Sequence, residues 1–185
     1  MTCRTESPGS RWPAALACLA LLAAGAGAHE GERHAGGQQA APPGPDEQAI
    51  IGVLERYARA MTGKDLTAIR PLLVPDDEFS YFEGTYVNRG WQSYYEHLEP
   101  EVKLFEQPEY RISEARAFAS GDLGYATFDW ALQVTVLSDR FEGGRHPVSM
   151  QGKGTAVFAR LGNQWKIRHL HTAQAPARKA DAPSH

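Results

Sequence analysis

The stretch LGYATFDWALQVTVL, residues 123–137, decides the fold class of this sequence. It is rich in β-branched and aromatic residues, which favour strands over helices. Similar segments lie at residues 110–119, 147–161 and 165–173, and short turn signals containing Gly, Asn or Asp separate them. The gaps are too short for the crossover helices that parallel neighbours would need, so we expect long, consecutive antiparallel strands.

The first half of the chain predicts helices at residues 46–62, 65–73 and 91–98, with a short strand pair between the last two, at residues 79–82 and 85–87. Asp46 and Asp65 are suitable N-cap residues for the first two helices. Apolar residues then repeat at helical spacing along the first helix, namely Ile50, Val53, Leu54, Tyr57 and Met61. Helices followed by consecutive strands indicate an α+β fold, in which a curved antiparallel sheet wraps around the N-terminal helices.

Residues 1–28 are typical of an export signal. Arg4 and Arg11 supply positive charge, an apolar run follows, and residues 26–28 read Ala-Gly-Ala, an A-x-A cleavage pattern. The apolar run is shorter than the roughly 20 residues that a membrane-spanning helix needs. We therefore expect cleavage before His29, a periplasmic or secreted protein, and no stable membrane insertion.

The predicted signal is followed by a leader, a folded domain and a tail. Residues 29–45 and 176–185 are dense in Gly, Pro, Ala and polar residues, so we expect a disordered leader and a flexible tail around a domain at residues 46–175. Both cysteines, Cys3 and Cys18, lie inside the signal, which excludes disulfides and thiol catalysis in the mature chain.

The charge of the chain argues against one class of partner. The formal net charge is −3 and the pI is about 6.2, so the basic excess that phosphate neutralisation requires is absent. We expect no nucleic-acid partner, and no motif predicts a cofactor.

Three segments together resemble the SnoaL-like branch of the NTF2-like superfamily: LERYARAMTGKDLTAIRPLL (54–73), GDLGYATFDWAL (121–132) and GKGTAVFARLGNQWKIRHLHTAQA (152–175). The resemblance implies a cone formed by a strongly bent sheet, with helices closing its concave side and a cavity at its open end. Domains of this family often form homodimers, so the resemblance also implies a homodimer.

The superfamily includes ketosteroid isomerases, and the resemblance allows their catalytic residues to be compared one by one. Tyr57 matches the first-helix tyrosine that donates a hydrogen bond to an oxyanion. The position of the general base falls near Phe82, and Glu83 would occupy it only if the register slipped by one residue. The position of the second acid offers Thr155. We therefore expect no ketosteroid isomerase chemistry, because proton abstraction needs a positioned base.

The last strand suggests a different set of polar groups. If its residues alternate regularly, Trp165, Ile167, His169 and His171 share one face, and the Trp and Ile should turn that face inward. The two histidines would then border the cavity as hydrogen-bonding groups or as a general base. The alternative is a purely structural role for both.

A metal site is not predicted. The His169–His171 pair could supply two imidazole ligands, but a stable zinc site usually needs a third or fourth ligand, and none is recognisable from spacing. Whether His29 and His34 bind copper through the new N-terminus stays open.

We expect this domain to bind a small, partly apolar molecule in the cone. The predicted ligand-binding residues combine inward polar groups with aromatic walls: Tyr57, Phe82, Trp91, Trp130, His169 and His171. One alternative is an isomerase, cyclase or lyase that uses His169 or His171 as a general base together with Tyr57. Another is a homo-oligomerisation module. Fold alone does not decide whether a reaction is catalysed, because this superfamily hosts many functions.

Overall fold

The computed structural model describes residues 42–175. The predicted signal at 1–28, most of the leader at 29–45 and the tail at 176–185 lie outside the described residues. The elements run in the order α1 (Pro45–Thr62), α2 (Leu66–Ile69), η2 (Arg70–Leu72), η3 (Asp76–Glu78), β1 (Ser80–Glu83), β2 (Tyr86–Arg89), α3 (Gly90–Leu104), β3 (Phe105–Ser120), β4 (Leu123–Leu137), η4 (Glu142–Gly144), β5 (Arg145–Leu161) and β6 (Gln164–Gln174).

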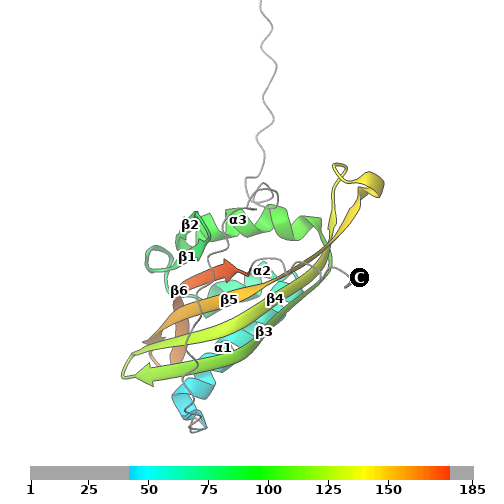
Figure 1. The fold of residues 1–185 in the computed structure, drawn as a ribbon. Coiled ribbons are helices and arrows are strands. Elements are labelled where there is room, and N and C mark those ends of the chain that lie inside the picture. Colours follow the sequence, from blue (N-terminus) through cyan, green and yellow to red (C-terminus); the bar gives the residue numbers. More distant parts are fainter. Residues whose placement is uncertain (1–41, 176–185) are drawn as a thin grey trace, which may run out of the picture. The chain divides into compact units, whose positions relative to one another are not determined.

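The six strands form one curved sheet in the order β2-β1-β6-β5-β4-β3 (Figure 1). Neighbouring strands are antiparallel except β1 and β6, which are parallel and lie far apart in the sequence. The prediction of an α+β fold with a curved sheet packed on helices is confirmed, and the single parallel pair is the difference. This pairing brings the short strand β1 beside β6, the last strand of the sheet.

Helix α1 packs against the inner face of the sheet. Its buried side chains include the five that were expected from helical spacing: Ile50, Val53, Leu54, Tyr57 and Met61. Pro45 stands at the first helical position, where its missing N–H has no partner to lose. None of the helices within residues 42–175 is long and apolar enough to cross a membrane.

Helix α3 is longer than predicted. It was expected over residues 91–98, but it continues through Pro100 and ends at Leu104. Proline removes one backbone hydrogen bond from a helix interior. The helix continues nevertheless, because Leu98 and Val102, one turn apart, are both buried in the core and hold this segment against it.

Two glycines of β5 allow large rings to lie across the inner face. Gly152 and Gly154 face Trp130 and Phe128 of β4 in the strand register. A Cβ atom at Gly154 would lie 2.3 Å from the Phe128 ring, and one at Gly152 would lie 2.8 Å from the Trp130 indole. Both distances are shorter than side chains tolerate, so glycine is required wherever these rings stay in place.

Candidate functional site

Tyrosines from three elements meet on the inner face of the sheet. The hydroxyl of Tyr57 on α1 is hydrogen-bonded to the hydroxyl of Tyr94 on α3, and both side chains are buried. Tyr81 on β1 has its ring centroid 4.7 Å from that of Tyr94, and its hydroxyl is hydrogen-bonded to Oγ1 of Thr172 on β6 at 3.0 Å. These contacts connect both long helices to the parallel strand pair.

A fourth tyrosine, Tyr110 on β3, extends the cluster toward β4. Its ring lies edge-on to Tyr57 at 6.0 Å and stacks on Trp130 at 6.3 Å, with an angle of 6° between the ring planes. Burial is the main cause that raises the pKa of all four phenols, Tyr57, Tyr81, Tyr94 and Tyr110. The phenols are therefore neutral near pH 7 and can donate hydrogen bonds.

A carboxylate belongs to the same cluster. Residues alternate along β1, so Glu83 shares the inner face with Tyr81, while Ser80 and Phe82 point to the other face. The Glu83 side chain is 44% exposed, and its charge contributes to the raised pKa of all four phenols. Burial, followed by the nearby Glu101, raises the pKa of Glu83 itself.

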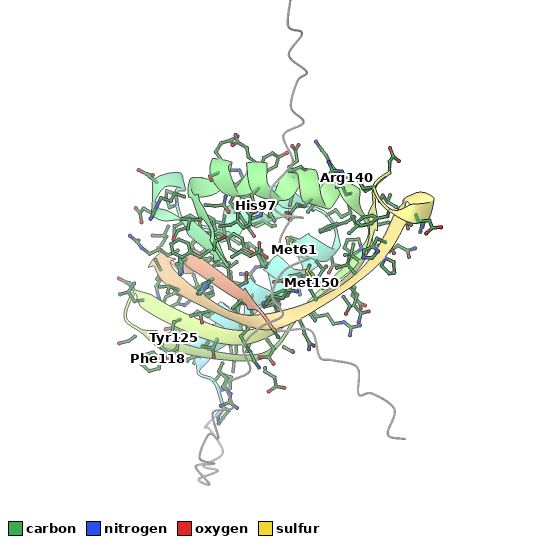
Figure 2. All side chains as sticks on the ribbon, turned by 45° about the horizontal axis from the view of Figure 1, so that its top comes forward. Met61, His97, Phe118, Tyr125, Arg140 and Met150 are labelled. Carbon is green, nitrogen blue, oxygen red and sulfur yellow. The ribbon has the colours of Figure 1, made fainter. Side chains whose placement is uncertain are left out.

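His97 on α3 lies beside this carboxylate. Its Nε2 atom is 3.8 Å from Oε2 of Glu83 and 3.7 Å from Oε1 of Glu101, and its Nδ1 atom is 2.8 Å from Oδ1 of Asn88 on β2. Figure 2 shows His97 on the side of α3 that faces the sheet. Glu101 and then Glu83 raise the pKa of His97, and burial opposes them.

The predicted placement of His169 and His171 on the inner face is wrong. Consecutive residues of β5, Val157 and Phe158, pair with His169 and Ile167, so Arg168 is an extra residue in β6. Such a β-bulge reverses the alternation of the side chains that follow it. Leu170 and Thr172 consequently point inward and are buried, while both histidines lie on the outer face.

The outer-face contacts of the two histidines confirm this arrangement. Ser80 Oγ lies 2.8 Å from Nδ1 of His169, and the Phe82 ring lies 4.9 Å from the His169 ring and 6.4 Å from that of His171. Burial, with a contribution from His171, lowers the pKa of His169. Phe82 therefore belongs with the histidines and not with Tyr57, so the predicted site is divided between two faces.

The other predicted aromatic residues have different positions. Trp130 lies on the inner face and is connected to Tyr57 through Tyr110. Trp91 is partly buried on α3 and packs against Tyr94 and Tyr95. Of the six predicted residues, Tyr57 and Trp130 are thus the two that the structure brings to one tyrosine cluster, with Trp91 at its edge.

The predicted set of ligand-binding residues missed three members of this site, namely Glu83, Tyr94 and His97. Helical spacing contains the missing signal, because Tyr94, His97 and Glu101 recur on one face of α3 at intervals of three and four residues. In β1, alternation from the buried Tyr81 identifies Glu83 as the inward carboxylate.

Two surface hollows lie away from these residues. One is bordered by Gln107, Gln133 and Ser149 and another by Arg116 and Lys153, along β3, β4 and β5. Neither includes a member of the tyrosine cluster. Within residues 42–175, no group of three or more His, Cys, Asp or Glu side chains is arranged to hold a metal ion.

The order of the strands and the helices packed inside the curved sheet are those of an NTF2-like fold. The family of SnoaL-like domains matches residues 50–177, which is most of the chain. The protein therefore belongs to the SnoaL-like domain family. A search of curated proteins finds no match.

Several solved structures share the fold. An NTF2-like superfamily protein from Salmonella enterica has a TM-score of 0.61 at 20% identity, with 75% of this chain and 96% of that chain covered. A protein from Novosphingobium aromaticivorans, described as "Putative Scytalone Dehydratase", has a TM-score of 0.61 at 14% identity, with 72% and 94% covered. At these identities the likeness shows the fold alone.

Proposed function

We propose that this domain binds a small, partly apolar carbonyl compound beside the tyrosine cluster and moves a proton on it. In this proposal Glu83 is the general base, and the Tyr57–Tyr94 pair donates a hydrogen bond to the carbonyl oxygen. The observation that carries the proposal is the half-exposed Glu83 carboxylate on the same face of β1 as Tyr81, whose ring contacts Tyr94 of the buried, hydrogen-bonded Tyr57–Tyr94 pair.

The chemistry follows from the two kinds of group. The carboxylate takes a proton from the carbon next to the carbonyl, the electron pair of the broken C–H bond forms a C=C bond, and the π pair of the carbonyl moves to its oxygen to give an enolate. A neutral phenol that is already oriented stabilises this negative charge more than the uncharged carbonyl, so it lowers the barrier. A carboxylate whose pKa is raised is also a better base at neutral pH than an ordinary one.

Glu83 changes the argument made from the sequence. The general base was expected near Phe82, where no carboxylate stands, and this absence led to the expectation of no ketosteroid isomerase chemistry. The inner face of β1 carries Glu83 instead, one residue later. The second acid has no equivalent, because Thr155 is exposed, so the proposed donor is the one phenol proton of the Tyr57–Tyr94 pair that is not used between the two hydroxyls.

The proposed reaction class is enolisation, which is the first half of an isomerisation and of many dehydrations. The dehydratase name of the Novosphingobium protein is compatible with this class. Substrate access would come from the side of Glu83, since the phenols of Tyr57, Tyr81 and Tyr94 are buried.

Solvent exchange tests the proposal without knowledge of the natural substrate. A panel of small cyclic ketones is incubated in D2O with the protein, and deuterium incorporation beside the carbonyl is followed by NMR. We expect at least one ketone to exchange faster than in buffer, and Glu83→Gln to lose about 10²–10⁴-fold of that acceleration, the usual contribution of a general base.

Glu109→Gln is the matched control, because Glu109 is a surface carboxylate paired with Arg111. It should exchange ketones at the wild-type rate. Acceleration that survives in Glu83→Gln, or no acceleration with any ketone of the panel, would refute the proposed chemistry.

The homodimer expected from the family resemblance is a further proposal. Apolar side chains at the outer β3–β4 end support it: Phe118, Leu123 and Tyr125 are each about half exposed or more, at 53%, 61% and 49%. Figure 2 shows Phe118 and Tyr125 side by side there. Exposed apolar groups of this size favour association. Sedimentation of wild type and Leu123→Asp tests it: a wild-type dimer that the substitution dissociates is expected, and a wild-type monomer would refute it.

A further inference from the structure

A chain of hydrogen bonds determines which nitrogen of His97 carries a proton. Nδ2 of Asn88 donates to the backbone oxygen of Ser93 at 3.0 Å and to Ser93 Oγ at 3.1 Å. A backbone oxygen can only accept, so the amide of Asn88 is oriented with Oδ1 toward His97. Because Oδ1 also only accepts, Nδ1 of His97 must be the donor in their 2.8 Å contact.

The other ring nitrogen of His97 faces negative charge. Its side chain is 9% exposed, and Nε2 has no hydrogen-bond partner among the described residues. The carboxylates of Glu83 and Glu101 lie at 3.8 and 3.7 Å, which is beyond hydrogen-bond length but within ion-pair range. A lone pair on Nε2 would be repelled by both carboxylates, whereas a proton there is attracted to them.

We infer that Asn88, held by Ser93, is a positioning residue that keeps His97 as an imidazolium facing Glu83 and Glu101, and that this cation keeps Glu83 ionised for its role as base. The role in catalysis rests on the proposed function. The protonation of His97 does not, since it follows from the contacts of the folded chain.

Among residues 42–175, the charged groups that act on His97 are the two carboxylates. From β1 it is faced by Tyr81 at 6.1 Å between ring centroids, and from β2 by Tyr86 at 5.6 Å. Glu83 comes from β1 and Glu101 from one turn further along α3. When the imidazolium loses its proton at higher pH, Glu83 keeps its burial and its repulsion from Glu101 but loses the cation that offsets them.

Nitrogen-15 NMR of the imidazole tests the first half of the inference, with His97→Gln used to assign the signal. We expect the wild-type pKa of His97 to lie above the ordinary 6.5, and the neutral form above it to retain its proton on Nδ1. Asn88→Leu, which removes the acceptor, should lower this pKa, and Asn88→Asp, which adds a negative charge, should raise it. Ser93→Ala keeps the backbone oxygen and is the control that should preserve the Nδ1 proton.

A neutral form protonated on Nε2, or Asn88 variants that shift the pKa in the same direction, would overturn the inference. So would a titration that changes on addition of EDTA, because the imidazole and carboxylates would then hold a cation instead of a proton. A purely structural role of Asn88 predicts lost stability in both variants without opposite pKa shifts.

The pH profile of ketone exchange tests the catalytic half. The rate should fall on the acidic side as Glu83 gains a proton, and this limb should move to higher pH in His97→Gln, because that variant lacks the cation that opposes the burial of Glu83. An acidic limb that stays at the wild-type pH in His97→Gln would overturn the role of His97 but not the proposed reaction. Absence of exchange in the wild type would refute the reaction and leave the NMR result standing.

Discussion

Removing both hydroxyls of the Tyr57–Tyr94 pair should cost less stability than the sum of the losses caused by removing each one alone. Phenylalanine at either position keeps the ring and its packing, including the contact of Tyr94 with the Phe79 ring at 5.4 Å. What changes is the remaining hydroxyl, which loses its partner inside the core, since Tyr57 is 3% exposed and Tyr94 is 0% exposed.

The size of the effect follows from this burial. A buried hydroxyl without a partner costs about 1–3 kcal/mol, so Tyr57→Phe and Tyr94→Phe should each lower the free energy of unfolding by about that amount. In the double variant no hydroxyl is left unpaired, so its loss should be smaller than the sum of the single losses by about 1 kcal/mol or more.

Urea unfolding followed by tryptophan fluorescence gives the three free energies, with the slope m compared to verify that the unfolded reference is unchanged. Tyr125→Phe is the control: Tyr125 is 49% exposed, and the change should stay within about 0.5 kcal/mol. Single losses that simply add in the double variant would show that the two hydroxyls do not pair in solution.

Three further outcomes are expected. Gly154→Ala should lower the free energy of unfolding by about 1–3 kcal/mol in urea titrations, because its Cβ would lie 2.3 Å from the Phe128 ring. The control is Gly52→Ala, which should not destabilise the protein, because Gly52 lies in a helix and its Cβ would have its nearest contact at 3.6 Å. Equal losses in the two variants would contradict the predicted clash. Folding raises the pKa of His97, so the stabilisation from its charge is complete below pH 6.5 and is lost as the pH rises through the pKa of the folded state. Thermal melts should therefore show that the wild type loses stability relative to His97→Gln over that pH interval. A gain in relative stability over the same interval would contradict the raised pKa. His171→Ala should change the free energy of unfolding by less than about 0.5 kcal/mol and leave ketone exchange intact, because His171 is exposed on the outer face. A loss of exchange would show that His171 belongs to the site that exchanges the ketone.

The sequence predicted the fold well where one periodicity runs along a whole element. The inward apolar residues of α1 and the strand at residues 123–137 were both predicted correctly, because the pattern of each element repeats many times and no local irregularity interrupts it. The parallel pairing of β1 with β6 could not be read in this way. A four-residue strand contains too little pattern to identify a partner that is distant in sequence.

The site was predicted less completely, for two physical reasons. In β6 a bulge reversed the side-chain alternation on which the assignment of His169 and His171 depended. In α3 the predicted helix ended at residue 98, which left it too short to show that Glu101 lies one turn beyond His97. Tyr57 was found because its place in the first helix is marked by both spacing and family resemblance.

The extra residue Arg168 shifts the alternation of β6, so every side chain after it points to the opposite face of the sheet. His169 and His171 belong to the surface, and Leu170 and Thr172 to the interior, on account of that one residue. In a related chain with the same residues but without this bulge, the residues that correspond to His169 and His171 would face the helices, and the residue that corresponds to Leu170 would face outward. Members of this family can therefore differ in which chemistry faces the ligand while their last strands look alike, and equivalent positions in β6 have to be matched by face before they are matched by residue type.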